Sequence, residues 1–306
     1  MTASLALVML AVAVGSVARP ALAADVAIIV SANVDEYQRA VKGFKATAQH
    51  RIVGEFDMEG DVERGRKILA EIQKKTKPDL IFAVGIWALQ VVVSEAMTTP
   101  VVYAMVLNPP TIVGGARNVT GASMNVPVEH TIRLFKQLGP QIKRIGVIYN
   151  QARTGYLVRR AETVARENGL VLVATEIRSS RDAIAALETM QDGIDALWIL
   201  PDETILAPTV VQQMLLFSYR KRVPLLGLSE SQAQAGALLS LSFASGEDIG
   251  RQAGDLANSI LAGKAAGELP YTTARQVKLT VNLKAAHRLG MEIPKSILDQ
   301  ANMIIQ

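Results

Sequence analysis

The chain repeats one unit, a short apolar strand followed by a turn and an amphipathic helix. Residues 26–30 (VAIIV) form a continuous apolar run of strand length, and Tyr37, Val41, Phe44 and Ala48 then fall on one face of a helix. Continuous apolar runs are typical of parallel strands that helices cover on both faces. The pattern therefore predicts an α/β fold.

The repeat occurs in two series, which a break at residues 118–121 (NVTG) separates. The first series predicts strands at residues 26–30, 52–56, 80–84 and 101–106. The second series predicts strands at residues 145–149, 170–174, 196–200, 223–227, 238–241 and 277–281. Two series indicate two Rossmann-like lobes with parallel sheets. Because ligands bind beyond the carboxyl ends of parallel strands, we expect a ligand cleft between the lobes.

The N-terminus has the layout of a secretory signal peptide. Residues 5–17 carry no charge, and Arg19, Pro20 and the small-residue site at residues 21–23 (ALA) follow them. We expect a signal peptide at residues 1–23, with the mature protein beginning at Ala24 in the periplasm. The apolar run is shorter than the roughly 20 residues of a spanning helix. A retained N-terminal anchor is the alternative.

Charge and cysteine content restrict the partners. The chain has 0 Cys, which excludes disulfides and a lipid-modified cysteine. The formal net charge of +4 arises from basic residues spread along predicted helices, such as Arg159, Arg160 and Arg166. No dense basic block with interleaved aromatic residues occurs, so we expect no nucleic-acid partner.

Motifs that carry catalysis are absent from the sequence. It contains neither a phosphate loop of the form G-x-x-x-x-G-K-[ST] nor a G-x-G-x-x-G motif. Residues 227–231 (GLSES) resemble a nucleophile elbow but lack its final glycine. His50, His130 and His287 do not sit in strand-end turns beside a carboxylate. We therefore expect no enzyme activity, no catalytic residue, no cofactor and no metal.

Short segments along nearly the whole mature chain resemble one known family. They are residues 28–31 (IIVS), 83–85 (AVG), 88–90 (ALQ), 118–121 (NVTG), 145–150 (IGVIYN), 200–202 (LPD), 227–230 (GLSE), 236–238 (GAL) and 248–254 (DIGRQAG). In this order and spacing they are similar to the ABC transporter substrate-binding proteins of the type I periplasmic fold. The branch that they resemble includes tryptophan- and tyrosine-binding members.

This resemblance implies a chain that crosses between the lobes more than once, near Ala122, Ala244 and Thr273. The N-terminal lobe would comprise residues 24–122 plus 244–272, and the C-terminal lobe residues 123–243 plus 273–306. It also implies a monomer that binds a small molecule and delivers it to an ABC transporter permease in the membrane. The alternative is a sensor that docks on a receptor kinase or chemoreceptor.

Four candidate ligand-binding residues follow the first and third strands of the first lobe. Ser31 and Asn33 either cap the next helix or bond to a ligand. Gly85 either makes a tight turn or opens a helix N-terminus to a carboxylate. Trp87 either stacks on an apolar ligand or packs in the core.

The segment at residues 103–108 (YAMVLN) is more apolar than is usual for the family. We expect Tyr103, Met105 and Asn108 to contribute to the ligand site. Trp87, Tyr103, Met105 and Val106 would supply an apolar wall on this lobe. Because this segment differs from the family pattern, the ligand need not be the one that better-known members bind.

Four polar residues follow strands of the second lobe, namely Asn150, Asp202, Ser229 and Glu230. Asp202 either accepts a ligand ammonium group or caps the next helix. Trp198 lies within an apolar strand and is interpreted as a core residue. Together, these features predict a small, partly apolar ligand with a carboxylate, such as an apolar or aromatic amino acid.

Overall fold

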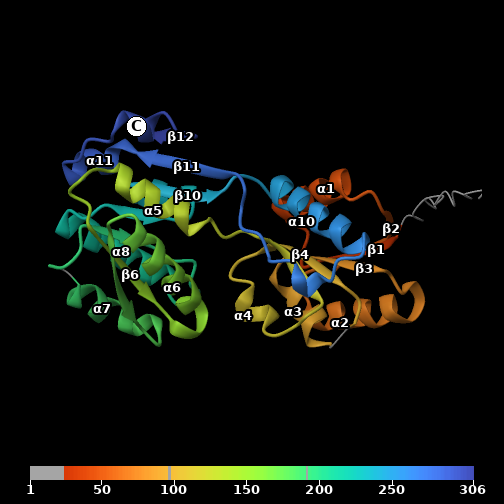
Figure 1. The fold of residues 1–306 in the computed structure, drawn as a ribbon. Coiled ribbons are helices and arrows are strands. Elements are labelled where there is room, and N and C mark those ends of the chain that lie inside the picture. Colours follow the sequence, from red (N-terminus) through yellow and green to blue (C-terminus); the bar gives the residue numbers. More distant parts are fainter. Residues whose placement is uncertain (1–23, 96–97, 191) are drawn as a thin grey trace, which may run out of the picture.

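A computed structural model describes residues 24–95, 98–190 and 192–306. The predicted signal peptide lies outside these residues. Figure 1 shows two lobes, each a sheet with helices on both faces, joined by extended segments. Within the described ranges, no helix has the length and apolar character needed to cross a membrane.

The first sheet is parallel and has the strand order β2-β1-β3-β4-β5. Its strands are β1 (Asp25–Val30), β2 (Arg51–Asp57), β3 (Leu80–Val84), β4 (Val101–Val106) and β5 (Val119–Ser123). The strands β3 and β4 are buried along their whole length, as their continuous apolar sequences require.

Helices cover both faces of this sheet. They are α1 (Asp35–Thr47), α2 (Val62–Glu71), the π-helical turn η1 (Ile72–Thr76), α3 (Ile86–Ser94) and α4 (Pro110–Val113). From the C-terminal half of the chain, α10 (Gly246–Leu261) returns and packs beside α1 (Figure 1). The backbones of α1 and α10 approach closely, because a Cβ at Gly250 would lie 1.9 Å from the carbonyl oxygen of Ala40.

The second sheet has the order β12-β11-β10-β9-β8-β6-β7. Its strands are β6 (Arg144–Tyr149), β7 (Val171–Glu176), β8 (Ala196–Trp198), β9 (Leu225–Gly227), β10 (Leu239–Phe243), β11 (Val277–Asn282) and β12 (Met303–Ile305). The sheet departs from the predicted parallel arrangement at one pairing, since β11 runs antiparallel to β10. The chain enters β11 directly from the first lobe, without a helix that would return it to the other end of the sheet.

The remaining helical segments follow β5 in the chain. They are α5 (Val128–Gln137), α6 (Gln151–Glu167), η2 (Ser180–Asp182), α7 (Ala183–Thr189), α8 (Pro208–Lys221), α9 (Glu230–Ala235), η3 (Ala266–Glu268), α11 (Leu283–Leu289) and α12 (Lys295–Leu298). Of these, η3 contacts β5 and so accompanies the first sheet. Buried side chains form separate cores on the two faces of each sheet.

Among the described residues, three segments connect the lobes. One follows β5, one follows β10, and one precedes β11, where Thr272 forms a bridge with Ala122. Since the carboxyl ends of β5 and β10 lead into two of them, residues just before or after a crossing lie close to the space between the lobes.

Candidate functional site

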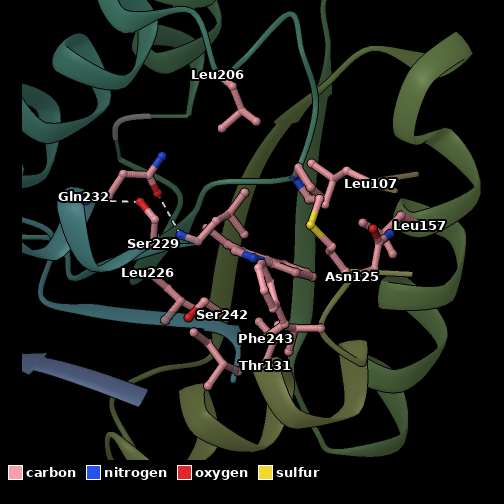
Figure 2. Close-up of a pocket in the computed structure, with 17 residues that line it drawn as sticks. Leu107, Asn125, Thr131, Leu157, Leu206, Leu226, Ser229, Gln232, Ser242 and Phe243 are labelled. Carbon is pink, nitrogen blue, oxygen red and sulfur yellow. Dashed lines mark hydrogen bonds between the residues drawn. The ribbon is translucent and has the colours of Figure 1, made fainter. Parts of the chain in front are cut away.

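A cavity of about 250 Å³ lies beside the crossing segments, and we call it the inner cavity (Figure 2). Its wall comes from the end of β4, the crossing segment after β5, the helices α5, α6 and α9, and the strands β8, β9 and β10 with the turns that follow β8 and β9. The lining residues are Leu107, Met124, Asn125, Val126, Thr131, Leu157, Trp198, Pro201, Leu206, Leu226, Gly227, Leu228, Ser229, Gln232, Leu241, Ser242 and Phe243. Leu107 comes from the first lobe, and the other lining residues come from the second lobe or from the segment that leads into it, so the cavity lies on the side of the second lobe that faces the first.

The lining is mainly apolar, and none of these residues is charged. Polar groups come from Asn125, Thr131, Ser229, Gln232 and Ser242. Two of them are held by the turn into α9, because the Gln232 side chain accepts a hydrogen bond from the Leu228 amide at 2.7 Å and Ser229 caps the helix (Figure 2). An apolar site with a few fixed polar groups is the usual character of small-molecule pockets.

A second cavity, of about 380 Å³, lies between α3 and α4 of the first lobe and α6 of the second, and we call it the outer cavity. It shares Leu107 and Pro201 with the inner cavity. Its lining residues are Ile86, Gln90, Val93, Ser94, Leu107, Asn108, Thr111, Ile112, Arg153, Pro201 and Glu203. Arg153 and Glu203 form an ion pair at 3.2 Å and are both largely exposed.

Asn108 ties the two lobes at the boundary between the cavities. Its side-chain amide donates a hydrogen bond to the carbonyl oxygen of Pro201. Its side-chain oxygen accepts hydrogen bonds from the Tyr156 hydroxyl and the Asn125 amide, each at 2.9 Å. Burial raises the pKa of Tyr156 above its usual range. Asn108 has a positive φ of 50°, which asparagine tolerates better than most residues.

Two of the predicted residues in the first lobe, Ser31 and Gly85, build the turn before α3 and line neither cavity. The buried Ser31 hydroxyl donates to the Val84 carbonyl and accepts from the Ala88 amide in the first turn of α3, each at 2.9 Å. Gly85 precedes α3 with a φ of +87°, and a Cβ there would lie 2.6 Å from the Ser31 hydroxyl. Asn33 is exposed and does not cap α1, whose N-cap residue is Val34.

The predicted apolar wall of the first lobe lines neither cavity. Trp87 is 41% exposed, lies against Gly60 and lines neither cavity. Tyr103 and Met105 lie inside β4 rather than in a loop, and both are buried in the core. Burial raises the pKa of Tyr103. These side chains face packed helices, because β4 is covered on both faces.

The predicted polar residues of the second lobe have partners of their own. The Asp202 carboxylate is fully buried and accepts hydrogen bonds from the Asn150 amide, the Thr154 hydroxyl and the Thr204 amide. The Asn150 side chain caps α6. Asp202 does not cap the next helix, α8, whose N-cap residue is Ala207. Its contacts instead hold the turns after β6 and β8 together.

Ser229 and Glu230 separate in the structure. Ser229 lines the inner cavity, whereas Glu230 forms an ion pair with Lys278 at 2.8 Å and lines neither cavity. Of the predicted site residues, the inner cavity therefore includes Ser229 and the outer cavity Asn108.

Sequence reasoning missed most of the inner cavity. Trp198, interpreted as a core residue, is buried and forms part of the cavity wall. Residues 124–126 and 241–243 immediately flank the implied crossings near Ala122 and Ala244. Their closeness to the implied crossings could have identified these residues from the sequence, because a cleft between two lobes lies beside the segments that join them. Within the described ranges, no cluster of His, Cys, Asp or Glu is placed to hold a metal ion.

The chain matches known proteins along almost its entire described length. A family model described as "ABC transporter substrate binding protein" matches residues 25–305. The curated "Tyrosine-binding protein" of Clostridioides difficile (strain R20291) is 25% identical over 224 residues, which are 71% of this chain and 64% of that relative. The match thus spans just under two thirds of that protein's length.

Solved structures agree on the fold. A conserved domain protein from Vibrio cholerae is 26% identical, with a TM-score of 0.64, over 92% of this chain and 99% of the other. An ABC domain from Streptococcus pneumoniae in complex with L-Trp is 22% identical, with a TM-score of 0.63, over 92% of this chain and 100% of the other. The described architecture is that of the type I periplasmic binding fold.

Proposed function

The chain belongs to the family of ABC transporter substrate binding proteins, which bind a ligand rather than transform it, and we propose that it captures a small, mostly apolar molecule and hands it to an ABC importer. The observation that carries this proposal is the inner cavity, an apolar pocket with a few fixed polar groups at the hinge between the lobes. A cavity of about 250 Å³ is just below the roughly 300–1,000 Å³ typical of sites for drug-sized ligands, so it fits a smaller molecule.

The ligand class that we propose is an apolar or aromatic amino acid or a related carboxylate. The lining, with Trp198, Phe243 and several leucines, supplies an apolar and aromatic surface. A tyrosine-binding relative and a neighbour of the same fold in complex with L-Trp support this class.

The lobes close on this ligand by a hinge motion at the crossing segments. Residues 124–126 and 241–243 line the cavity and lead into two of these segments. A rotation of the lobes therefore changes the shape of the cavity directly. We take the lobes to be residues 24–122 plus 244–272 and residues 123–243 plus 273–306.

The family is extracytoplasmic, and we propose that the signal peptide at residues 1–23 directs this chain to the periplasm. There the monomer docks on the membrane permease of an ABC transporter. A sensor that docks on a receptor kinase or chemoreceptor uses the same cleft. Neighbouring genes for a permease and an ATPase would favour import, whereas a neighbouring histidine kinase gene would favour sensing.

A thermal-shift screen of amino acids, nucleosides and sugars tests the proposed function. A ligand at a hundred times its Kd stabilises the folded state by about 2.7 kcal/mol, which raises the Tm by several degrees. We expect stabilisation by apolar or aromatic amino acids or related carboxylates. Stabilisation by sugars alone would contradict the ligand class, and no stabilisation by any small molecule would contradict ligand capture.

A further inference from the structure

Arg153 and Glu203 are the two charged side chains that line either cavity among the described residues. We propose that they bind the head group of a zwitterionic α-amino acid, whose carboxylate pairs with Arg153 and whose ammonium group pairs with Glu203. The inference rests on the proposed function and adds to it the residues that recognise the charged end of the ligand. The apolar side chain of that amino acid occupies the inner cavity.

The two cavities share a wall, and the proposed ligand extends across it when the lobes open and the Asn108–Pro201 hydrogen bond breaks. Leu107 from the first lobe and Pro201 from the second line the inner and the outer cavity alike. Pro201 and Glu203 belong to the same turn after β8, so the acidic side chain lies close to the boundary between the cavities. A small amino acid placed at this boundary presents its side chain to one cavity and its head group to the other.

The charge distribution determines the orientation of the ligand. The inner cavity has no charged lining residue, and an unpaired buried charge is strongly unfavourable. The zwitterionic end therefore stays in the outer cavity, where an acidic and a basic side chain lie 3.2 Å apart. Gln90 and Thr111 of the first lobe add neutral hydrogen-bonding groups opposite this pair.

The Arg153–Glu203 pair is free to exchange its partners. The two side chains are 51% and 64% exposed, and exposed ion pairs contribute little to stability. A ligand carboxylate also accepts two parallel hydrogen bonds from a guanidinium group. By contrast, the acidic groups predicted for this role are occupied, Asp202 by three hydrogen bonds within its own lobe and Glu230 by Lys278.

Calorimetric titration with three related probes separates the two charge contacts. The probes are L-tryptophan, indole-3-propionate, which lacks the ammonium group, and tryptamine, which lacks the carboxylate. We expect Arg153→Ala to weaken the binding of L-tryptophan and of indole-3-propionate about tenfold or more. The binding of tryptamine should weaken less than about twofold. We expect Glu203→Gln to weaken the binding of L-tryptophan and of tryptamine by a similar factor and to leave the binding of indole-3-propionate unchanged.

Arg160→Ala is the matched control. Arg160 lies on the same helix α6, is similarly exposed, forms an ion pair with Glu129 and lines neither cavity. We expect this variant to bind all three probes as the wild type does. Because Arg153 and Glu203 are exposed, their variants should melt at the wild-type temperature, which is checked first.

Three outcomes would overturn the inference. They are unchanged L-tryptophan affinity in both cavity variants, an equal loss for all three probes in either variant, and binding of uncharged apolar compounds by a wild-type protein that binds no amino acid. The last outcome leaves the proposed capture of a small molecule intact. A protein that binds no small molecule at all contradicts the proposed function itself.

Discussion

The side-chain amide of Asn108 in the first lobe donates a hydrogen bond to the carbonyl oxygen of Pro201 in the second lobe. The same side chain accepts a hydrogen bond from Tyr156, which also belongs to the second lobe. The lobes are therefore joined by a polar contact in addition to the crossing segments. Because Asn108 and Pro201 border the outer cavity, this contact influences the spacing of the cleft.

We expect Asn108→Ala to loosen the lobes of the empty protein. The substitution leaves the Tyr156 hydroxyl and the Pro201 carbonyl without this partner, and such losses cost about 1–3 kcal/mol each when the groups stay buried. Small-angle X-ray scattering should show a larger radius of gyration than in the wild type.

Asn33→Ala serves as the control for this experiment, because Asn33 is exposed and lines neither cavity. It should leave both the scattering profile and the Tm unchanged. If Asn108→Ala also gives the wild-type radius, the Asn108 contact does not set the lobe spacing.

The two tryptophans should respond differently to ligand. Trp198 is buried in the wall of the inner cavity, whereas Trp87 is 41% exposed beside Gly60. We expect Trp87→Phe to retain a change in tryptophan emission when L-tyrosine is added, and Trp198→Phe to lose it. Emission is excited at a wavelength that tyrosine does not absorb. A signal that follows Trp87 would place the ligand against α3 instead of in the inner cavity.

Asp202 should stabilise the protein through its carboxylate hydrogen bonds. Hydrogen bonds to charged groups contribute about 1.5–3 kcal/mol each, and Asp202 accepts three from its own lobe. We expect Asp202→Ala to lower the free energy of unfolding in urea by at least about 2 kcal/mol. The neighbouring exposed Glu203→Ala should change it by less than about 0.5 kcal/mol. Equal effects of the two variants would refute this structural role.

The exported protein should begin at Ala24. Residues 5–17 and the small residues at 21–23 have the signal-peptide layout, and cleavage there removes the apolar run. Intact mass measurement of the protein from the periplasmic fraction gives the start directly. Recovery of the uncleaved chain from the membrane fraction would instead support a retained anchor.

The strands β3 and β4 were predictable because a strand buried on both faces is a continuous apolar run. The apolar runs at residues 80–84 and 101–106 coincide with β3 and β4. The interpretation of residues 118–121 as a break was wrong, since β5 (Val119–Ser123, VTGAS) is a buried strand without such a run. The antiparallel β11 was not predictable in the same way, because a strand's direction depends on where the chain enters the sheet.

The candidate site was less accessible to sequence reasoning. Trp198 lies in an apolar run, and such a run is equally consistent with a core residue and with a residue in a cavity wall. Asn108 was recognisable from its place after a strand, but its partner Pro201 lies 93 residues further along the chain. Such a contact depends on the relative placement of the lobes, which no local pattern encodes.

Ligand capture in the inner cavity is tested most directly by filling the cavity. Ser242 lines it from β10 and is half-buried, whereas Ser296 is exposed on α12. Calorimetric titration with the most stabilising molecule of the screen should show binding to the wild type and to Ser296→Phe. Ser242→Phe should bind at least about a hundredfold more weakly, a loss of about 2.8 kcal/mol, while it stays folded. If the folded Ser242→Phe variant binds this molecule as tightly as the wild type, the ligand site is not the inner cavity.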